Sequence, residues 1–370
     1  MEGNSAMSAA AMIDRTITEA ITAGVFPGAV VLVTREGAVC KRTAYGHSLL
    51  YHDLCRRQEQ PIPMTPETIF DLASLTKVVV TTTAVLQLAE RGRIALDAPV
   101  CTYLDGFARP DKRAITVRQL LTHTSGLPAD RPSYRRFHGA EAIVAAVGRA
   151  RLAGAPGARV IYSDLGFIAL GAIGAIVARV SLDRYAATHI FAPLGLRHTG
   201  YLPPPAAHAR IAPTEYRRGR ALVWGGVHDE KAAAMGGVSG HAGLFGTADD
   251  LAVFTTMLLN EGRHGSRQIV RPETVRAMFT AQTGALSPSR GLGWLRDDPS
   301  FMGTLASEHT TGHTGFTGTS IVLDLARRLS VILLTNRVHP SRNGPAIGPT
   351  RAAVAGAAAT LSTPSTPSTP

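Results

Sequence analysis

The sequence contains few cysteines. Cys40, Cys55 and Cys101 are odd in number and far apart, so they form neither a disulfide framework nor a CxxC metal-binding pair. The chain also has no Gly-Lys pair, no Gly-x-Ser-x-Gly segment and no His-Glu-x-x-His segment. These absences exclude a phosphate-binding loop, the nucleophile elbow of α/β-hydrolases and the common helical zinc site. We therefore expect neither a metal ion nor a cofactor.

Long apolar segments are also missing. The longest stretch, LGFIALGAIGAIVARV from Leu165, is shorter than the about 20 residues that cross a bilayer, and it predicts a buried core helix. The first residues, MEGNSAMSAAAMIDRTITEAI, lack a basic flank followed by an apolar core, so they predict no signal peptide. We expect a cytoplasmic protein without a membrane span.

Lysine is scarce although the chain is basic. There are 38 basic and 27 acidic residues, which gives a formal net charge of +11. The only lysines are Lys41, Lys77, Lys112 and Lys231. The arginines occur as scattered pairs, and no single helix or loop collects them. This distribution indicates a solvated surface and argues against a nucleic-acid partner.

Strand patterns occur at both ends of the chain and helical patterns in the middle. Two β-rich runs flank Arg35-Glu36-Gly37, which predicts a hairpin, whereas the polar, proline-rich residues 47–66 predict a loop. Strands return in GHTGFTGTSIVLDLARRLSVILLTN near the end. The fold class predicted is α/β (α+β), with a central antiparallel sheet flanked by helices.

The same pattern predicts how the chain divides into domains. Residues 1–92 and 235–360 are expected to form one α/β domain, built from both ends of the chain. Residues 93–234 are expected to form a mostly helical inserted domain. Residues 361–370 contain a Thr/Pro repeat that cannot bury a core, so we expect a disordered tail.

The segment FDLASLTKVVVTTTAVLQLAERG places Ser74 three residues before Lys77, in a helix expected from about Ser74 to Arg91. Residues three apart share a helix face, so the hydroxyl and the amine can meet. A serine needs a base to become a nucleophile, and burial and a helix N-terminus both lower a lysine pKa. The alternative is that Ser74 caps the helix, although a capping box favours Glu or Gln where Lys77 stands.

Two further segments carry chemistry. In YSDLGFIAL, Tyr162 and Asp164 stand where a loop enters a helix; a tyrosine beside a lysine can pass a proton, or Asp164 can simply cap the helix. In GHTGFTGTS, His313 and Thr314 precede Gly315 on an expected strand, and a strand glycine often marks the close approach of a ligand. A strand-edge histidine is the alternative there.

Other histidines belong to polar loops. VHDEK groups His228, Asp229 and Glu230, which could contact a metal or substrate, but a solvated polar loop is the expectation. His123 and His241 are expected to hydrogen-bond loops near the site.

The three chemical segments, in this order, resemble the serine β-lactamase and penicillin-binding-protein superfamily, and in particular the class C β-lactamase-related serine hydrolases and esterases. Longer segments carry the same resemblance: TIFDLASLTKVVVTTTAVLQLAERGRIALDAPV, ITVRQLLTHTSGLP, YSDLGFIALG, IFAPLGLRHTGY, GLFGTADDLAVF, GLGW and HTGFTGTSIVLD. The resemblance covers roughly residues 10–340.

The resemblance implies a role for each matching residue. Ser74 would be the acylated nucleophile, Lys77 its general base, and Tyr162 the proton donor to the leaving group. The backbone N–H groups of Ser74 and Phe316 would form the oxyanion hole. The substrate-binding residues would be Asp164 and the strand residues His313, Thr314 and Gly315.

Two positions depart from the family pattern. Asp164 stands where the family has asparagine, and His313 stands where it has the lysine that helps recognise a substrate carboxylate. Histidine is only partly charged at pH 7, and Asp164 adds negative charge, so both changes are expected to weaken the binding of anions.

We therefore expect a metal-free serine hydrolase that forms an acyl-enzyme on a small ester, amide or peptide, with carboxylesterase activity first. The alternatives are a peptidase for D-amino-acid or peptidoglycan-type peptides, a weak β-lactamase, or a silent ligand-binding member. The sequence does not determine the oligomeric state.

Overall fold

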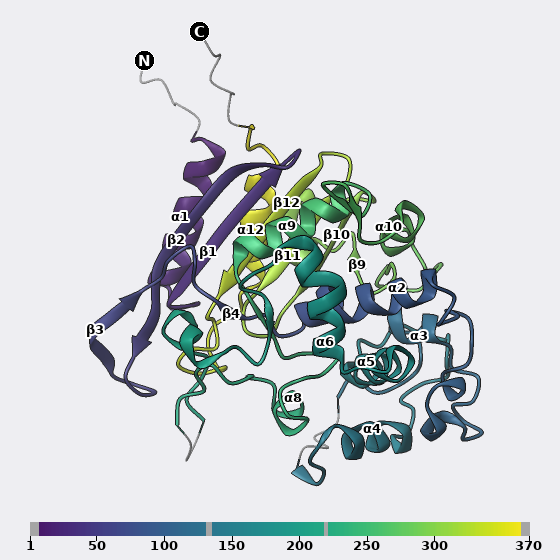
Figure 1. Cartoon of the computed structure of the whole chain (residues 1–370). Helices are drawn as coiled ribbons and strands as arrows, with labels where there is room; N and C mark the ends of the chain where they lie inside the picture. Colours follow the sequence, from purple (N-terminus) through teal and green to yellow (C-terminus); the bar gives the residue numbers. More distant parts are fainter. Residues whose placement is uncertain (1–6, 131–134, 218–220, 364–370) are drawn as a thin grey trace.

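The computed structural model describes residues 7–130, 135–217 and 221–363. Its centre is a seven-stranded antiparallel sheet with the order β3-β2-β1-β12-β11-β10-β9 (Figure 1). The strands are β1 (Gly28–Arg35), β2 (Ala38–Tyr51), β3 (Arg57–Pro63), β9 (Leu295–Arg296), β10 (Thr310–Thr314), β11 (Ser320–Asp324) and β12 (Leu329–Thr335). Because β1 pairs with β12, with Val31 opposite Leu333, the two ends of the chain share one sheet. The predicted fold class is confirmed.

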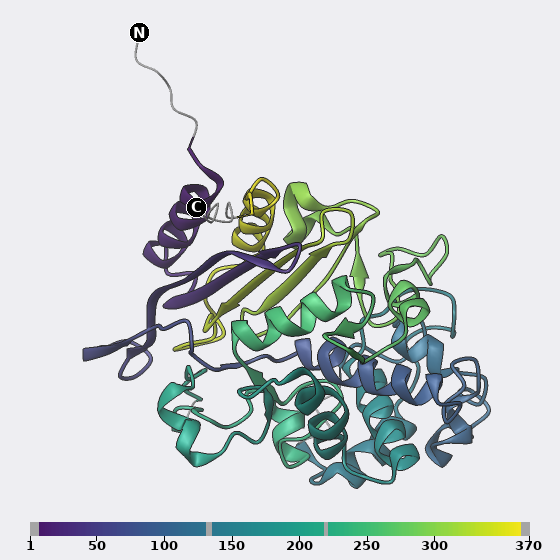
Figure 2. The ribbon, with the colours of Figure 1, turned by 45° about the horizontal axis from the view of Figure 1, so that its top comes forward.

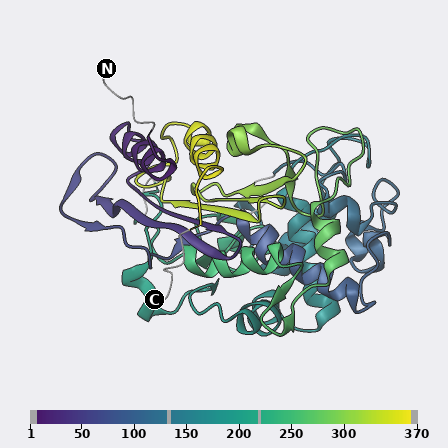
Figure 3. The ribbon, with the colours of Figure 1, turned by 90° about the horizontal axis from the view of Figure 1, so that it is seen from above.

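Apolar side chains on β1 alternate between two cores. Val30 and Leu32 pack on the face that meets the helical half of the molecule, and Val31 and Val33 pack on the opposite face. The opposite face is covered by α1 (Ala9–Thr22) and α12 (Gly348–Ala358), which lie side by side (Figures 2 and 3). Since both faces are buried, the strand reads as a continuous apolar run.

Helices fill the space on the other side of the sheet. They include α2 (Thr83–Glu90), α3 (Val117–Leu121), α4 (Ala140–Arg149), α5 (Asp164–Ala178), α6 (Leu182–Ala186), α8 (Glu230–Ala234), α9 (Ala248–Leu259) and α10 (Pro272–Phe279). Helix α9 lies against the sheet, and α5 lies among the helices beyond it (Figure 1). Most of α5 is buried, as its apolar sequence predicted.

Local turn and cap signals agree with the structure. Glu36 and Gly37 both have positive φ angles, 52° and 82°, as a tight hairpin turn with the twist of its strands requires. Thr247 caps α9 by accepting a hydrogen bond from the Asp250 N–H. Both signals lie within a few residues of the element that they shape.

The expectation of a loop over residues 47–66 is wrong. Strand β2 continues to Tyr51, and β3 pairs with it at the edge of the sheet. Most of β3 is exposed and it contains Pro61. An edge strand has one unpaired side, so it tolerates proline and needs little apolar alternation.

The helix expected from Ser74 begins at Leu75, and its first part is wound more loosely than an α-helix. Residues Lys77–Thr82 form a π-helical turn, and α2 follows directly. Such turns are rare in helices and occur frequently at functional sites.

The predicted division into two domains stays a prediction. A small sheet of β4 (Phe70–Asp71), β6 (Leu244–Gly246) and β5 (Gly200–Tyr201) joins segments from both sides of the predicted boundary. Leu361, expected in a disordered tail, packs with the α1–α12 core, and residues 364–370 lie outside the described residues.

Within the described ranges no single helix has the length and apolar character of a membrane span. Residues Asp164–Ala178 and Leu182–Leu194 meet that test only as a pair, bent by 73°.

A buried histidine ties the sheet edge to a long loop. The His339 Nδ1 donates to the Thr214 carbonyl at 3.1 Å, and its Nε2 accepts from the Leu50 and Tyr51 N–H groups at 3.4 and 3.2 Å. Burial lowers the pKa of His339 to about 4. Protonation would cost the two strand hydrogen bonds.

This histidine predicts acid sensitivity. A folded-state pKa below the ordinary 6.5 means that the stabilisation is complete above pH 6.5 and is lost as the pH falls toward 4. We expect His339→Gln to reduce the loss of unfolding free energy between pH 7 and 4.5 by about 2 kcal/mol, measured by urea denaturation. His52→Gln, at an exposed histidine, is the control. An unchanged pH slope in His339→Gln would contradict the assignment.

Candidate active site

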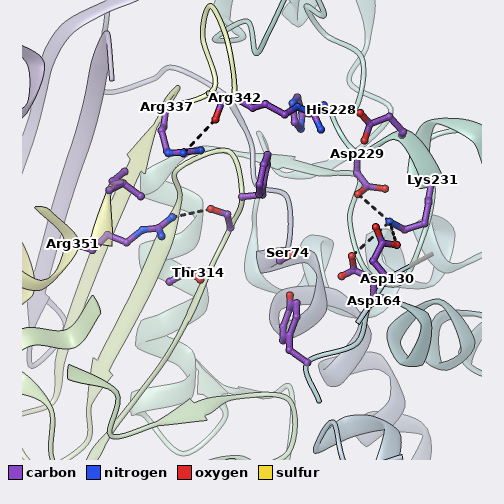
Figure 4. A pocket seen from close by; sticks show the side chains of 15 residues that line it. Ser74, Asp130, Asp164, His228, Asp229, Lys231, Thr314, Arg337, Arg342 and Arg351 are labelled. Atoms are coloured by element: carbon purple, nitrogen blue, oxygen red, sulfur yellow. Dashed lines mark hydrogen bonds and ion pairs between the residues drawn. The ribbon is translucent and has the colours of Figure 1, made fainter. Parts of the chain in front are cut away.

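Ser74 lies in a pocket of about 570 Å³. The pocket is lined by Ser74, Asp130, Tyr162, Asp164, His228, Asp229, Glu230, Lys231, Thr314, Gly315, Phe316, Arg337, Arg342, Ile347 and Arg351. The acidic residues and Lys231 lie on one side of Ser74, and Arg337 and Arg351 lie on the other (Figure 4). Most of the site residues predicted from the sequence therefore meet in one cavity.

The backbone around Ser74 is tightly held. Ala73 has a φ angle of 47°, an uncommon conformation for alanine, and its N–H donates to the Asp71 carboxylate at 2.8 Å. The Ser74 hydroxyl accepts from the Lys77 ammonium at 3.0 Å. None of the helix caps described uses the Ser74 side chain, so the geometry argues against a capping role.

Lys77 is fully buried and surrounded by polar groups. Its Nζ lies 3.0 Å from the Ser74 Oγ, 3.0 Å from the His241 carbonyl oxygen and 2.8 Å from the Asp164 Oδ1. Burial alone would lower the Lys77 pKa, but Asp164 and then Tyr162 outweigh burial and raise it to about 12. The expectation of a lowered pKa is wrong for the resting site, because a carboxylate faces the ammonium group.

Tyr162 is packed between rings and cations. Its ring centroid lies 5.0 Å from the Lys77 Nζ, and the rings of His123 and His313 lie 4.6 and 5.9 Å away. The guanidinium of Arg290 lies 5.5 Å from the same centroid. Arg290 is buried, and its Nε and Nη1 have no hydrogen-bond partner among the described residues. The sequence did not single out this arginine.

His313 does not carry a partial charge. Its Nδ1 donates to the Thr314 carbonyl at 2.9 Å, and burial, followed by Lys77 and Arg290, lowers its pKa to about 3. His313 is therefore neutral at pH 7, and it cannot attract an anion by charge. The sequence analysis expected a partly charged histidine, and this expectation is wrong. The burial of His313 and its neighbours Lys77 and Arg290 depend on the fold and are not apparent from the sequence.

Asp164 lies between two lysines. Its Oδ1 is 2.8 Å from the Lys77 Nζ, and its Oδ2 is 3.7 Å from the Lys231 Nζ. The negative charge that Asp164 adds is therefore balanced within the protein, so the expected repulsion of an anionic substrate does not follow. Ser163, and not Asp164, caps α5 by accepting from the Gly166 N–H.

The VHDEK segment was expected to be a solvated loop, and this expectation is wrong. His228 and Lys231 are buried, and the segment lines the pocket. The Asp229 carboxylate accepts from His241 at 2.8 Å, and His228 meets Glu215 at 2.6 Å. The sequence contains one indication that Lys231 belongs to a site: it is one of only four lysines, and it directly follows His228, Asp229 and Glu230.

One grouping in the described part of the chain has the spacing of a metal site. Ligand atoms of Asp164, Asp229 and His241 lie within 4.8 Å of one another. Lys77 and Lys231 already place ammonium groups 2.8 to 3.9 Å from these carboxylates. A divalent cation would face both ammonium groups, so the residues present do not fit a metal ion.

The turn after β10 is tied to the segment before Ser74. The Thr317 and Thr319 hydroxyls donate to the carbonyls of Asp71 and Leu72 at 2.7 and 3.1 Å. A Cβ at Gly315 would lie 2.1 Å from the Thr319 Oγ1, so only glycine fits there. These ties bring the Phe316 and Ser74 N–H groups into the same pocket wall, and neither has an acceptor among the described hydrogen bonds. An oxyanion hole at these groups stays a prediction.

The far end of the pocket is positively charged. The Phe316 ring, 54% exposed, stacks on His228, and Arg337 and Arg342 approach it. Arg342 pairs with Glu215 and Glu230.

In contrast, Arg337 and Arg351 have no carboxylate partner among the described ion pairs. The Arg351 Nη2 donates to the Gly315 and Thr319 carbonyls, both at 2.8 Å. Sequence reasoning missed both arginines, because nothing local distinguished them from the many surface arginines.

Comparisons with known proteins show which family this chain resembles. The family model "Beta-lactamase" matches residues 13–356. A protein named "Putative D-alanyl-D-alanine carboxypeptidase" from Escherichia coli (strain K12) is 35% identical, over 91% of this chain and 84% of its own length. An "N-acetylmuramyl-L-alanine amidase" from Bacillus subtilis (strain 168) is 36% identical, over 88% of this chain and 80% of its own length.

A solved structure is similar over nearly the whole chain. It is described as "EstCE1, a hydrolase with promiscuous acyltransferase activity", with a TM-score of 0.74 and 26% identity, and it covers 94% of this chain and 98% of its own. The family model and the two relatives each match most of this sequence. The chain therefore belongs to the β-lactamase family, within the superfamily of serine β-lactamases and penicillin-binding proteins.

Proposed function

We propose that the protein is a serine hydrolase that forms an acyl-enzyme at Ser74 on an amide bond of a carboxylate-bearing peptide of the peptidoglycan type. The observation that carries the choice of substrate is the pair of arginines at the far end of the pocket, Arg337 and Arg351, which have no carboxylate partner among the described residues. The names of the carboxypeptidase and amidase relatives support the same class.

The first step uses the contact between Ser74 and Lys77. In its amine form, the Lys77 Nζ takes the Ser74 hydroxyl proton while the Ser74 Oγ bonds to the substrate carbonyl carbon. The carbonyl π electrons move to its oxygen, where the N–H groups of Ser74 and Phe316 would stabilise the charge.

Collapse of the intermediate expels the leaving group. The leaving nitrogen takes a proton through Tyr162, whose ring lies 5.0 Å from the Lys77 Nζ. Water then gives a proton to the Lys77 amine and attacks the acyl carbon, the bond from that carbon to the Ser74 Oγ breaks, the Oγ takes the proton back from Lys77, and the acid is released.

The two arginines favour an anionic group on the substrate. Burial lowers the pKa of Arg337, and burial with the charge of Arg337 lowers the pKa of Arg351 to about 10, so the pair carries an uncompensated repulsion. A carboxylate between the two guanidinium groups would remove it and would form charge-assisted hydrogen bonds. This substrate class replaces our first expectation of a neutral ester.

Carboxylesterase activity is the second candidate. The likeness to EstCE1 and the exposed Phe316 ring, which offers apolar contact to an acyl chain, favour it.

The nucleophile is tested by labelling. A fluorophosphonate probe is expected to label wild-type protein at Ser74, identified by peptide mapping, and not the Ser74→Ala variant. Ser5→Ala is the control. Absence of label at Ser74 would refute the serine hydrolase and would favour a silent ligand-binding member. The wild-type protein is also incubated with a fluorescent penicillin. A long-lived penicillin adduct would favour the peptidase, whereas labelling by the fluorophosphonate alone would favour the esterase.

The protonation state of Lys77 predicts a pH dependence. Because its pKa is raised to about 12, the amine fraction below that pH increases about tenfold per pH unit. We expect the rate constant for labelling of Ser74 to rise nearly tenfold per unit from pH 6 to 9. A plateau beginning near pH 7 would contradict the charged resting state of Lys77.

The arginine pair is tested with matched peptides. Arg337→Met is expected to raise KM by about 10- to 100-fold for an N-acyl-D-alanyl-D-alanine with a free carboxylate, since hydrogen bonds to charged groups contribute about 1.5–3 kcal/mol. The same peptide with a C-terminal amide should show little change, and Arg109→Met is the control variant. Equal effects on both peptides would show that Arg337 does not bind the carboxylate.

A further inference from the structure

Lys231 is a second buried lysine in the pocket wall, and no role in the reaction described above requires it. Its side chain is 5% exposed. Its Nζ lies 2.7 Å from the Asp130 Oδ1, 3.7 Å from the Asp164 Oδ2 and 3.9 Å from the Asp229 Oδ2 (Figure 4). Lys231 forms no described contact with Ser74 or Lys77.

Asp164 connects the two lysines. One of its oxygens faces Lys77 at 2.8 Å and the other faces Lys231. A carboxylate beside a lysine stabilises the ammonium form, whereas the base that activates Ser74 must be the amine form. With Lys77 as its single partner, Asp164 would hold that lysine more firmly as an ammonium.

A second cation on the same carboxylate opposes this effect in two ways. It draws part of the negative charge of Asp164 toward itself, and its own charge disfavours a proton on Lys77. Solvent screens both effects little, because the Lys77 and Lys231 side chains are buried and Asp164 is only 20% exposed. The asparagine of the family pattern would need no such counter-charge, but the aspartate in this chain does.

We propose that Lys231 is a positioning residue that shares Asp164 with Lys77 and thereby keeps Lys77 available as the base. The inference rests on the proposed function, since it assigns Lys231 a part in the activation of Ser74. It also explains why a chain with aspartate in place of asparagine has a buried lysine on the other side of that aspartate.

Other charged groups face this cluster. His241 approaches Asp164 from the loop before β6 and hydrogen-bonds Asp229. Asp130 approaches Lys231 from the loop after α3.

The neutral His313 and the cationic Arg290 lie, like Lys77, within about 6 Å of the Tyr162 ring centroid. Of these groups, Asp130 is the most exposed, with 55% of its side chain accessible.

The test measures the rate constant for fluorophosphonate labelling of Ser74 against pH, which needs no natural substrate. In Lys231→Met, the increase of the labelling rate constant with pH is expected to occur about one pH unit higher than in the wild type. Labelling at pH 8 would then be about tenfold slower. Lys231→Arg keeps the charge and should recover the rate to within about threefold. The apparent affinity for the probe should not change, which separates this role from substrate binding.

A double-mutant cycle isolates the shared carboxylate. In the Asp164→Asn background, adding Lys231→Met should slow labelling less than about threefold, because no carboxylate remains to be shared. An equal slowing in both backgrounds, or no slowing in the wild-type background, would overturn the proposal.

Two further variants complete the test, one as a control for the loss of a buried lysine and one as an independent change at Lys231. Lys112 is also buried and donates to the Gly148 carbonyl at 2.7 Å, outside the pocket lining, so Lys112→Met should leave labelling unchanged. Asp130→Asn removes a competing anion from Lys231 and should speed labelling at pH 8 by about threefold. If Lys231→Met does not fold, an unchanged or slower rate in Asp130→Asn overturns the proposal. Failure to label wild-type Ser74 would instead refute the proposed function.

Discussion

The buried ion pair between Lys77 and Asp164, 2.8 Å long, is the interaction on which the rest of the site depends. It fixes the lysine beside Ser74 and sets the charge of that lysine. Asp164 begins α5, so the pair also joins the main helix of the helical half to the π-helical turn that carries Lys77. A buried charge left without a polar partner is strongly destabilising, so an apolar residue at either position would affect fold and chemistry together.

The pocket is best understood as two charged regions on either side of Ser74. In one region the carboxylates have partners within the protein, because Asp130, Asp164 and Asp229 face Lys231 and Lys77. The other region differs, since Arg337 and Arg351 have no carboxylate partner among the described ion pairs. A substrate that brings its own carboxylate completes the second region and leaves the first to the chemistry. If the proposed function holds, this separation of charge within one cavity lets an enzyme with a neutral His313 bind an anionic substrate.

Features that depend on neighbouring residues were predictable from the sequence. The hairpin at Glu36-Gly37, the Thr247 cap and the pairing of Ser74 with Lys77 all lie within a few positions, where turn chemistry and helix periodicity act. The family resemblance added the order of the three motifs. The strands at both ends also predicted the shared sheet, because apolar β-rich runs need a common partner.

Features that depend on distant residues were not predictable. His313 is neutral because it is buried and because Lys77 and Arg290 lie near it. One oxygen of Asp164 faces Lys231, which stands 67 positions later in the sequence. Edge strand β3 lacks an apolar pattern because one side of it is solvated. In each case the deciding neighbour comes from another part of the fold, so propensity and spacing carried no signal.

The charge of Lys77 can be measured directly because the chain has only four lysines. Protein grown with ¹³C-lysine gives four Cε resonances, and a Lys77→Arg variant assigns the one from Lys77. The account predicts that this resonance keeps its ammonium shift through pH 10, with the titration near 12. Titration of the Lys77 resonance between pH 7 and 9 would contradict the buried ion pair as the controlling interaction.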